Sequence, residues 1–178
     1  MTRNKSILSH NSVLEHLHTF KQVPISIGCT LEDEKKDILI DQEWDICQDT
    51  GIIQLRDPLS LELVYKYPHN DAFGTSWDNH FRKFSSFISK YNPKNVLEIG
   101  GGSGKLSSLY VKRNPTCHWT MLEPNPQGYD LNPTKNQNIE IIQEWFTNDY
   151  KIKQNTDAIV HTHVLEHTYD PIDFLKTI

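Results

Sequence analysis

Three glycines separated by single residues lie between a short apolar run and a helical pattern, an arrangement that can hold a ligand. The apolar run is Val96–Ile99, and Gly100, Gly102 and Gly104 follow it, with Glu98 just before them. Glycines let the backbone turn sharply and approach a bound molecule closely. The start of the next helix adds N–H groups and positive potential. The segment therefore predicts a strand, a ligand-contacting loop and a helix, with an unliganded glycine-rich turn as the alternative.

The spacing excludes two well-known phosphate-binding loops. A P-loop reads G-x-x-x-x-G-K-[ST], but Gly100 to Gly104 is one residue too short and Leu106 stands where Ser or Thr would bind magnesium. A dinucleotide loop reads G-x-G-x-x-G, but its third glycine would fall at Ser103 or Ser107. The pattern Glu-x-Gly-x-Gly-x-Gly is met at every position.

A second carboxylate, Glu123, ends the next predicted strand. It lies 19 residues beyond Gly104. An acid at this place can accept hydrogen bonds from both hydroxyls of a ribose. Glu123 therefore predicts a nucleoside ligand, without choosing between cofactor classes. The alternative is a solvated carboxylate at the end of a strand.

Three histidines lie close together after the fourth predicted strand. His161, His163 and His167 accompany Glu166, and neutral imidazole is a common metal ligand. The spacing resembles the zinc motif of metallo-β-lactamase-type hydrolases, but one extra residue separates His163 from the pair Glu166 and His167. A metallohydrolase is therefore the weakest of the function hypotheses, and no metal ligand is predicted.

Alternating strand and helix patterns position these residues in the second half of the chain. A helix is predicted over residues 105–113, and strands over residues 117–122 and 139–142 and from residue 158. Aromatic residues at helical spacing predict a further helix over residues 76–91, with Ser76 as its N-cap.

The first half of the chain carries weaker patterns. Residues 1–22 have a weak helical pattern, residues 23–57 indicate short strands and turns, and residues 59–67 predict a short helix.

Composition limits the class of protein. The 178 residues carry a net charge of −5, which argues against a general nucleic-acid binder. No apolar run approaches the roughly 18 residues of a membrane helix, and we expect no secretory signal, because the first residues lack an apolar stretch. Three scattered cysteines are too few for a disulfide framework. We expect a cytoplasmic protein without nucleic-acid or membrane partners.

The order of strand, acid, three glycines and helix resembles motif I of class I S-adenosylmethionine-dependent methyltransferases. The resemblance implies S-adenosyl-L-methionine as the cofactor. It implies that the cofactor is held by Glu98, Gly100, Gly101, Gly102, Gly104 and Glu123. The adenine ring of these enzymes lies near the loop after the third strand, where Trp145 or Phe146 can stack on it.

The histidine segment is similar to the motif that follows strand four in these methyltransferases. His163 takes the place of a residue, often asparagine, close to the cofactor, and His167 that of a histidine facing the active site of sugar methyltransferases. Methyl transfer is an in-line displacement that depends on positioning, with a base that removes the acceptor proton. Imidazole suits this task near neutral pH, so His167 is the predicted catalytic base. His161 has no predicted role.

Residues 44–91 resemble the region before motif I in nucleotide-sugar C-methyltransferases. Three short pieces carry the resemblance, namely Cys47–Leu55, Tyr65–Tyr67 and Ser76–His80. The resemblance makes Tyr67 the predicted second catalytic residue, orienting or deprotonating the acceptor.

That family carries a zinc module here, which this sequence matches poorly. Thr50 replaces its second cysteine, and the first cysteine pair is missing. A structural zinc ion needs four ligands, so we expect a degenerate module without metal. The alternative is an irregular site built from Cys29, Cys47 and two of the histidines His10, His16 and His18.

The resemblance implies an α/β fold with a Rossmann-like sheet and a small N-terminal α+β region. Residues 76–178 would form the cofactor-binding domain, and residues 1–75 the substrate or degenerate zinc-module region. The family's sheet has the strand order 3-2-1-4-5-7-6, of which this chain supplies strands one to four. Residues 171–178 read as the opening of a helix without a terminating signal. We therefore expect a piece of a longer protein.

The expected function is methyl transfer from S-adenosyl-L-methionine to a small metabolite. The resemblance implies a nucleotide-linked sugar of surface polysaccharide synthesis as the acceptor. The alternative is a non-catalytic binding or interaction protein that a partner chain completes. Strand four would be an open sheet edge beside apolar surface, which favours association with a partner or a second copy.

Overall fold

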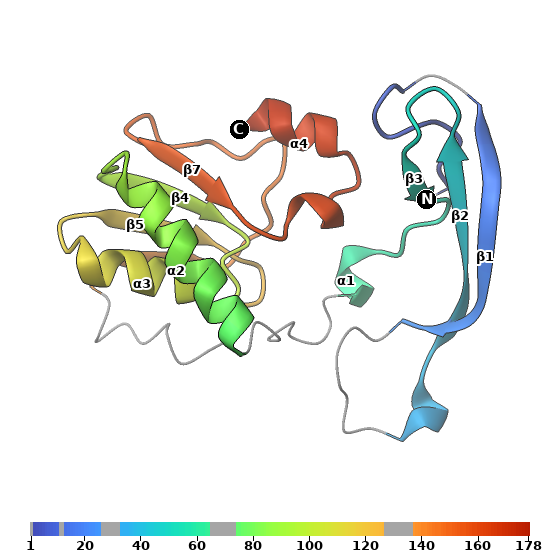
Figure 1. Cartoon of the computed structure of the whole chain (residues 1–178), viewed down its shortest axis with the longest axis horizontal. Helices are drawn as coiled ribbons and strands as arrows, with labels where there is room; N and C mark the ends of the chain where they lie inside the picture. The colour runs from blue at the N-terminus through green and yellow to red at the C-terminus, as the bar shows by residue number, and fades with distance from the viewer. Residues whose placement is uncertain (1, 11–12, 26–32, 65–73, 127–136) are drawn as a thin grey trace. The chain divides into compact units, whose positions relative to one another are not determined.

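The computed structural model describes residues 2–10, 13–25, 33–64, 74–126 and 137–178 (Figure 1). They belong to two compact units. One unit comprises residues 1–69 with 169–173, and the other comprises residues 70–168 with 174–178. None of the helices in these described ranges is long and apolar enough to cross a membrane.

The first unit is built on a three-stranded antiparallel sheet. Its strands, in the order β1-β2-β3, are β1 (Leu14–Pro24), β2 (Leu39–Cys47) and β3 (Ile53–Leu55). A 3-10 turn, Glu34–Lys36, precedes β2, and the short helix α1 (Leu61–Val64) follows β3. The helix predicted over residues 59–67 is thus confirmed for four residues, and its last three lie outside the described part.

The helix indicated by the weak pattern over residues 1–22 was a wrong prediction. Leu14 lies opposite Cys47 in the ladder between β1 and β2, and residues 14–22 belong to strand β1. The interior of this unit is largely polar. Asp45 is 2% exposed, and the Arg56 guanidinium donates hydrogen bonds to both its carboxylate oxygens. Buried charges persist in proteins when they are paired in this way.

The second unit is an α/β layer built on a parallel sheet, which confirms the predicted fold class (Figure 1). The strands, in the order β6-β5-β4-β7, are β4 (Asn95–Ile99), β5 (His118–Leu122), β6 (Ile139–Ile142) and β7 (Ala158–His161). Its helices are α2 (Thr75–Ser89) and α3 (Lys105–Arg113), and a 3-10 turn covers Leu165–His167. Helix α4 (Pro171–Thr177) contributes its residues 174–177 to this unit.

Helix α2 starts one residue earlier than its sequence predicted. Gly74 precedes the first helical residue, Thr75, and no side chain caps the helix. Ser76 lies inside the first turn, so its predicted role as N-cap was wrong.

The parallel sheet has different surroundings on its two faces. Helices α2 and α3 cover one face, and a buried core fills the space between, formed by Phe81, Ile88, Val96, Leu106, Tyr110, Val111, Cys117, Trp119, Met121 and Val160. A smaller core of Leu97, Ile99, Leu122 and Phe174 lies on the other face. Because alternate strand residues face opposite sides, Glu98 shares the helix-covered face with Val96.

Strand β7 forms the outer edge of the described sheet, next to β4. A hollow of about 350 Å³ lies beside it, lined by α2 residues that include Phe87, by Tyr91 and by all four residues of β7. Phe87 is 50% exposed and Tyr91 is 72% exposed. This edge has the apolar surroundings expected from the sequence. The partner or second copy predicted there stays a prediction.

Candidate functional site

The glycine loop is held tightly between β4 and the strand next to it. The Gly100 N–H donates to the Leu122 carbonyl oxygen over 2.8 Å. Gly100 has φ +72°, and a Cβ atom there would lie 2.4 Å from a methyl carbon of Val164. At Gly101 a Cβ atom would lie 2.3 Å from Cγ of Met121. A side chain at either position would therefore clash with these atoms, and this accounts for glycine at both positions.

The tip of the loop is tied to the predicted nucleoside-binding carboxylate. The Gly102 N–H donates to Oε2 of Glu123 over 2.9 Å, and the Asn125 N–H donates to Oε1 over 3.0 Å. No atom of the described residues lies within 4 Å of a Cβ atom placed at Gly102, so these residues leave the tip of the loop uncovered. The structure thus brings together the loop and Glu123, which lie at the ends of the neighbouring strands β4 and β5.

Helix α3 begins directly after this loop. Gly104, at φ +70°, immediately precedes its first residue. The Gly104 N–H donates to the Gly101 carbonyl oxygen over 2.9 Å. The Ser107 hydroxyl donates to the Gly104 carbonyl oxygen over 2.8 Å. The N-terminal end of a nine-residue helix therefore lies at the loop, where its dipole favours negative charge.

The acid of the motif, Glu98, lies beneath the loop. Its side chain is 1% exposed, and Oε2 accepts a hydrogen bond of 2.8 Å from the indole N–H of Trp119. Burial raises the pKa of Glu98 to about 7, the Trp119 hydrogen bond opposes the rise, and the charge of Glu123 adds to it. A Cβ atom at Gly101 would lie 3.1 Å from Oε2 of Glu98, so this buried carboxylate lies next to the loop. Its predicted contact with a cofactor stays a prediction.

A cluster of aromatic and imidazole rings follows strand β7. The His163 ring lies edge-on to Trp77, with 4.7 Å between ring centroids, and 5.4 Å from the His80 ring. His80 forms a hydrogen bond of 3.0 Å with the Thr162 hydroxyl. Burial lowers the pKa of His80, and His163 lowers it further. No catalytic or binding role was predicted for Trp77 or His80, because their proximity to His163 depends on how α2 packs beside β7.

The three histidines of this segment point to different surroundings. His161 packs on Phe174, with 5.3 Å between ring centroids. Burial lowers its pKa, and the charge of Glu166 opposes this. His163 pairs with Glu166, with 3.3 Å from Nδ1 to Oε1. His167 is exposed, and its backbone N–H donates to the Val164 carbonyl oxygen over 2.9 Å.

Within the described ranges, no three His, Cys, Asp or Glu side chains come close enough to share a metal ion. Cys47 is buried at the end of β2. Cys29 of the irregular zinc alternative and the predicted catalytic Tyr67 lie outside the described residues.

The two aromatic candidates for adenine stacking have different environments. Phe146 packs in the second core, with ring centroids 5.4 Å from Phe174 and 5.6 Å from Tyr150. Trp145 is 38% exposed. Phe146 is thus packed in the core and Trp145 is partly exposed, and adenine stacking by either residue stays a prediction.

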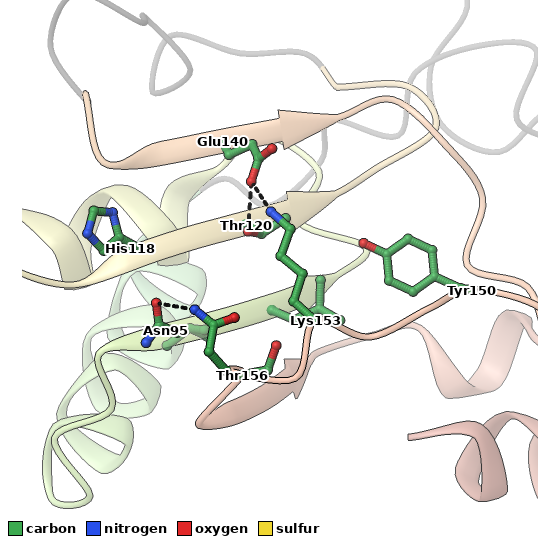
Figure 2. A pocket seen from close by; sticks show the side chains of 10 residues that line it. Asn95, His118, Thr120, Glu140, Tyr150, Lys153 and Thr156 are labelled. Atoms are coloured by element: carbon green, nitrogen blue, oxygen red, sulfur yellow. Dashed lines mark hydrogen bonds and ion pairs between the residues drawn. The ribbon is translucent and has the colours of Figure 1, made fainter.

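A separate polar hollow of about 290 Å³ lies on the sheet near the first residues of its strands (Figure 2). Lys153 reaches over the sheet to Glu140, with 2.6 Å between Nζ and Oε2 (Figure 2). The Thr120 hydroxyl donates to the same oxygen over 3.2 Å. None of the residues predicted to bind a cofactor lines this hollow, so it is distinct from the loop site.

Comparison with known proteins matched a family model and a set of solved structures. A family model described as a methyltransferase domain matches residues 76–178, more than half of the chain. A solved structure of the plantazolicin methyltransferase BpumL in complex with SAH is 22% identical, with a TM-score of 0.44, over 57% of this chain and 44% of that one. The chain thus spans less than half the length of that protein. The search of curated proteins gave no match.

Proposed function

This chain belongs to the methyltransferase-domain family, and on that premise we propose that it binds S-adenosyl-L-methionine at the glycine loop and transfers a methyl group to a small metabolite. The observation that carries the proposal is the Glu123 carboxylate, which the Gly102 N–H holds at the tip of the loop over 2.9 Å. A carboxylate at the end of this strand is placed to accept ribose hydroxyls.

The residues present fit such a nucleoside cofactor. Each oxygen of Glu123 accepts one backbone N–H, and a carboxylate has about four acceptor sites, so capacity for two hydroxyls is left. The described residues leave the Gly102 backbone uncovered, so a cofactor can lie against it. Trp145, 38% exposed, offers a ring face for adenine. The bound cofactor supplies a methyl group on a positively charged sulfur, and the chain holds the acceptor in line with it.

A nucleotide-linked sugar is the acceptor that we propose. The support comes from sequence pieces ahead of the loop, Cys47–Leu55 and Ser76–His80, which resemble nucleotide-sugar C-methyltransferases. Transfer of tritium from methyl-labelled cofactor to nucleotide sugars, with the matching free sugars as controls, tests this class. Labelling of the free sugars alone would contradict it.

A non-catalytic binding or interaction protein is the second candidate. The apolar hollow beside β7, with Phe87 and Tyr91 exposed, favours it. S-adenosylhomocysteine binding without methyl transfer to any acceptor class would support this candidate over the enzyme.

Calorimetric titration with S-adenosylhomocysteine tests the proposed cofactor directly. We expect one site per chain with a Kd of about 1 μM, a binding free energy of about −8 kcal/mol. NAD⁺ is the matched control, because it also carries an adenosine ribose that Glu123 could bind. Binding of NAD⁺ with no binding of S-adenosylhomocysteine would contradict the proposal.

A further inference from the structure

His163 has a carboxylate beside one ring nitrogen, and no described residue forms a hydrogen bond with the other. Its Nδ1 lies 3.3 Å from Oε1 of Glu166, and the two side chains are 53% and 52% exposed. No hydrogen bond to the Nε2 atom of His163 is formed by the described residues. In a neutral imidazole, the carboxylate that accepts a proton from one nitrogen leaves the other as a proton acceptor.

The backbone holds this ring in an unusual conformation. His163 has φ +55°, a left-handed conformation that non-glycine residues rarely adopt and that tends to occur at functional sites. The edge contact with Trp77, 4.7 Å between centroids, fixes the ring from the α2 side. The next residue, Val164, packs against Gly100 of the loop. His163 is thus anchored beside the loop from two directions.

We propose that His163 is the proton-accepting residue of this site and that Glu166 is its positioning residue. The inference rests on the proposed function. The acceptor's nucleophilic atom forms a bond to the methyl carbon while the carbon–sulfur bond breaks. The electron pair of the broken bond stays on sulfur. The acceptor's proton goes to Nε2 of His163. Glu166 holds the other ring proton on Nδ1 and stabilises the imidazolium that forms.

The assignment differs from the one that the sequence resemblance implies. That resemblance places the base at His167, in the 3-10 turn Leu165–His167. The Glu166 carboxylate in this structure pairs instead with His163. The substrate class follows from the assignment, because an acceptor served by His163 carries a proton to lose, as a hydroxyl or an acidic carbon does.

The first test reads the ring proton directly. Long-range ¹H–¹⁵N NMR of the whole chain should show the proton of neutral His163 on Nδ1. Glu166→Ala should move it toward Nε2, whereas Glu62→Ala, which removes an exposed carboxylate from α1, should not. A proton on Nε2 of His163 in the unmodified chain would overturn the proposal, because that nitrogen could not then accept one.

The second test places the ring at the cofactor site. Diethyl pyrocarbonate modifies unprotonated imidazole, and mass spectrometry measures the rate at each histidine. S-adenosylhomocysteine at about ten times its Kd should slow modification of His163 about tenfold and leave exposed His118 unchanged. If the ligand binds and protects His167 but not His163, the assignment is overturned. If calorimetry shows no binding, the proposed function fails first, and the two failures are distinguishable.

Discussion

Replacing Gly100 by alanine should lower the free energy of unfolding by about 2–5 kcal/mol. A left-handed backbone costs a non-glycine residue about 1–2 kcal/mol, and Gly100 has φ +72°. The added Cβ would also lie 2.4 Å from Cγ2 of Val164, and overpacking of this kind costs about 1–3 kcal/mol. Urea unfolding followed by circular dichroism measures the change.

Gly102→Ala is the matched control for this prediction. Gly102 also has a positive φ, +53°, but no neighbouring atom lies within 4 Å of its Cβ position among the described residues. Only the backbone cost of about 1–2 kcal/mol should appear. Val164→Ala should partly rescue Gly100→Ala, with a favourable coupling of about 1 kcal/mol or more. Equal losses at both glycines and no coupling would show that the Val164 contact is not what excludes a side chain.

Replacing Glu98 by glutamine should make the protein more stable at pH 8, by about 3 kcal/mol. The pKa of Glu98 is raised from 4.5 to about 7 in the folded protein. The folded state therefore binds one more proton than the unfolded state between these values. Its stability falls as pH rises through this window and stays low above it. Glutamine cannot ionise, and its amide oxygen can still accept the Trp119 hydrogen bond.

Urea unfolding of both proteins at pH 4.5 and pH 8 measures this effect. The difference in free energy of unfolding between the two proteins should grow toward pH 8. Subtracting one free energy from the other at each pH removes the contributions of histidines such as His80 and His161, whose pKa values are lowered by burial. The same difference at both pH values would show that folding does not raise the pKa of Glu98.

The glycine loop and the α/β half of the fold were predictable because their signals are local. The strand over residues 139–142 and the helix over residues 105–113 have the predicted bounds. Strand β4 gains one residue, Asn95. Each is a short apolar run or an amphipathic turn with breakers at its ends, so neighbouring residues alone determine it.

Elements and contacts that depend on distant residues were missed. Leu14 lies in a segment whose apolar residues have a weak helical spacing, but it pairs with Cys47 across an antiparallel ladder. Pairing between distant residues leaves no periodic signal in the sequence. His80 and Thr162 are 82 positions apart and form a hydrogen bond of 3.0 Å. The pairing of His163 with Glu166 had the right spacing for a local contact, but the left-handed backbone that permits it has no sequence signature.

The central claim is that Glu123 and the glycine loop form a cofactor site, and one titration tests it most directly. S-adenosylhomocysteine is titrated into the chain, into Glu123→Ala and into Glu140→Ala. Glu140 is the control because it is also a strand carboxylate in this sheet, and it lines the separate polar hollow. Loss of hydrogen bonds to a charged acceptor costs about 1.5–3 kcal/mol. We predict that Glu123→Ala weakens binding about tenfold or more and that Glu140→Ala leaves it unchanged. Equal binding by all three proteins, or no binding by the folded unmodified chain, would contradict the account.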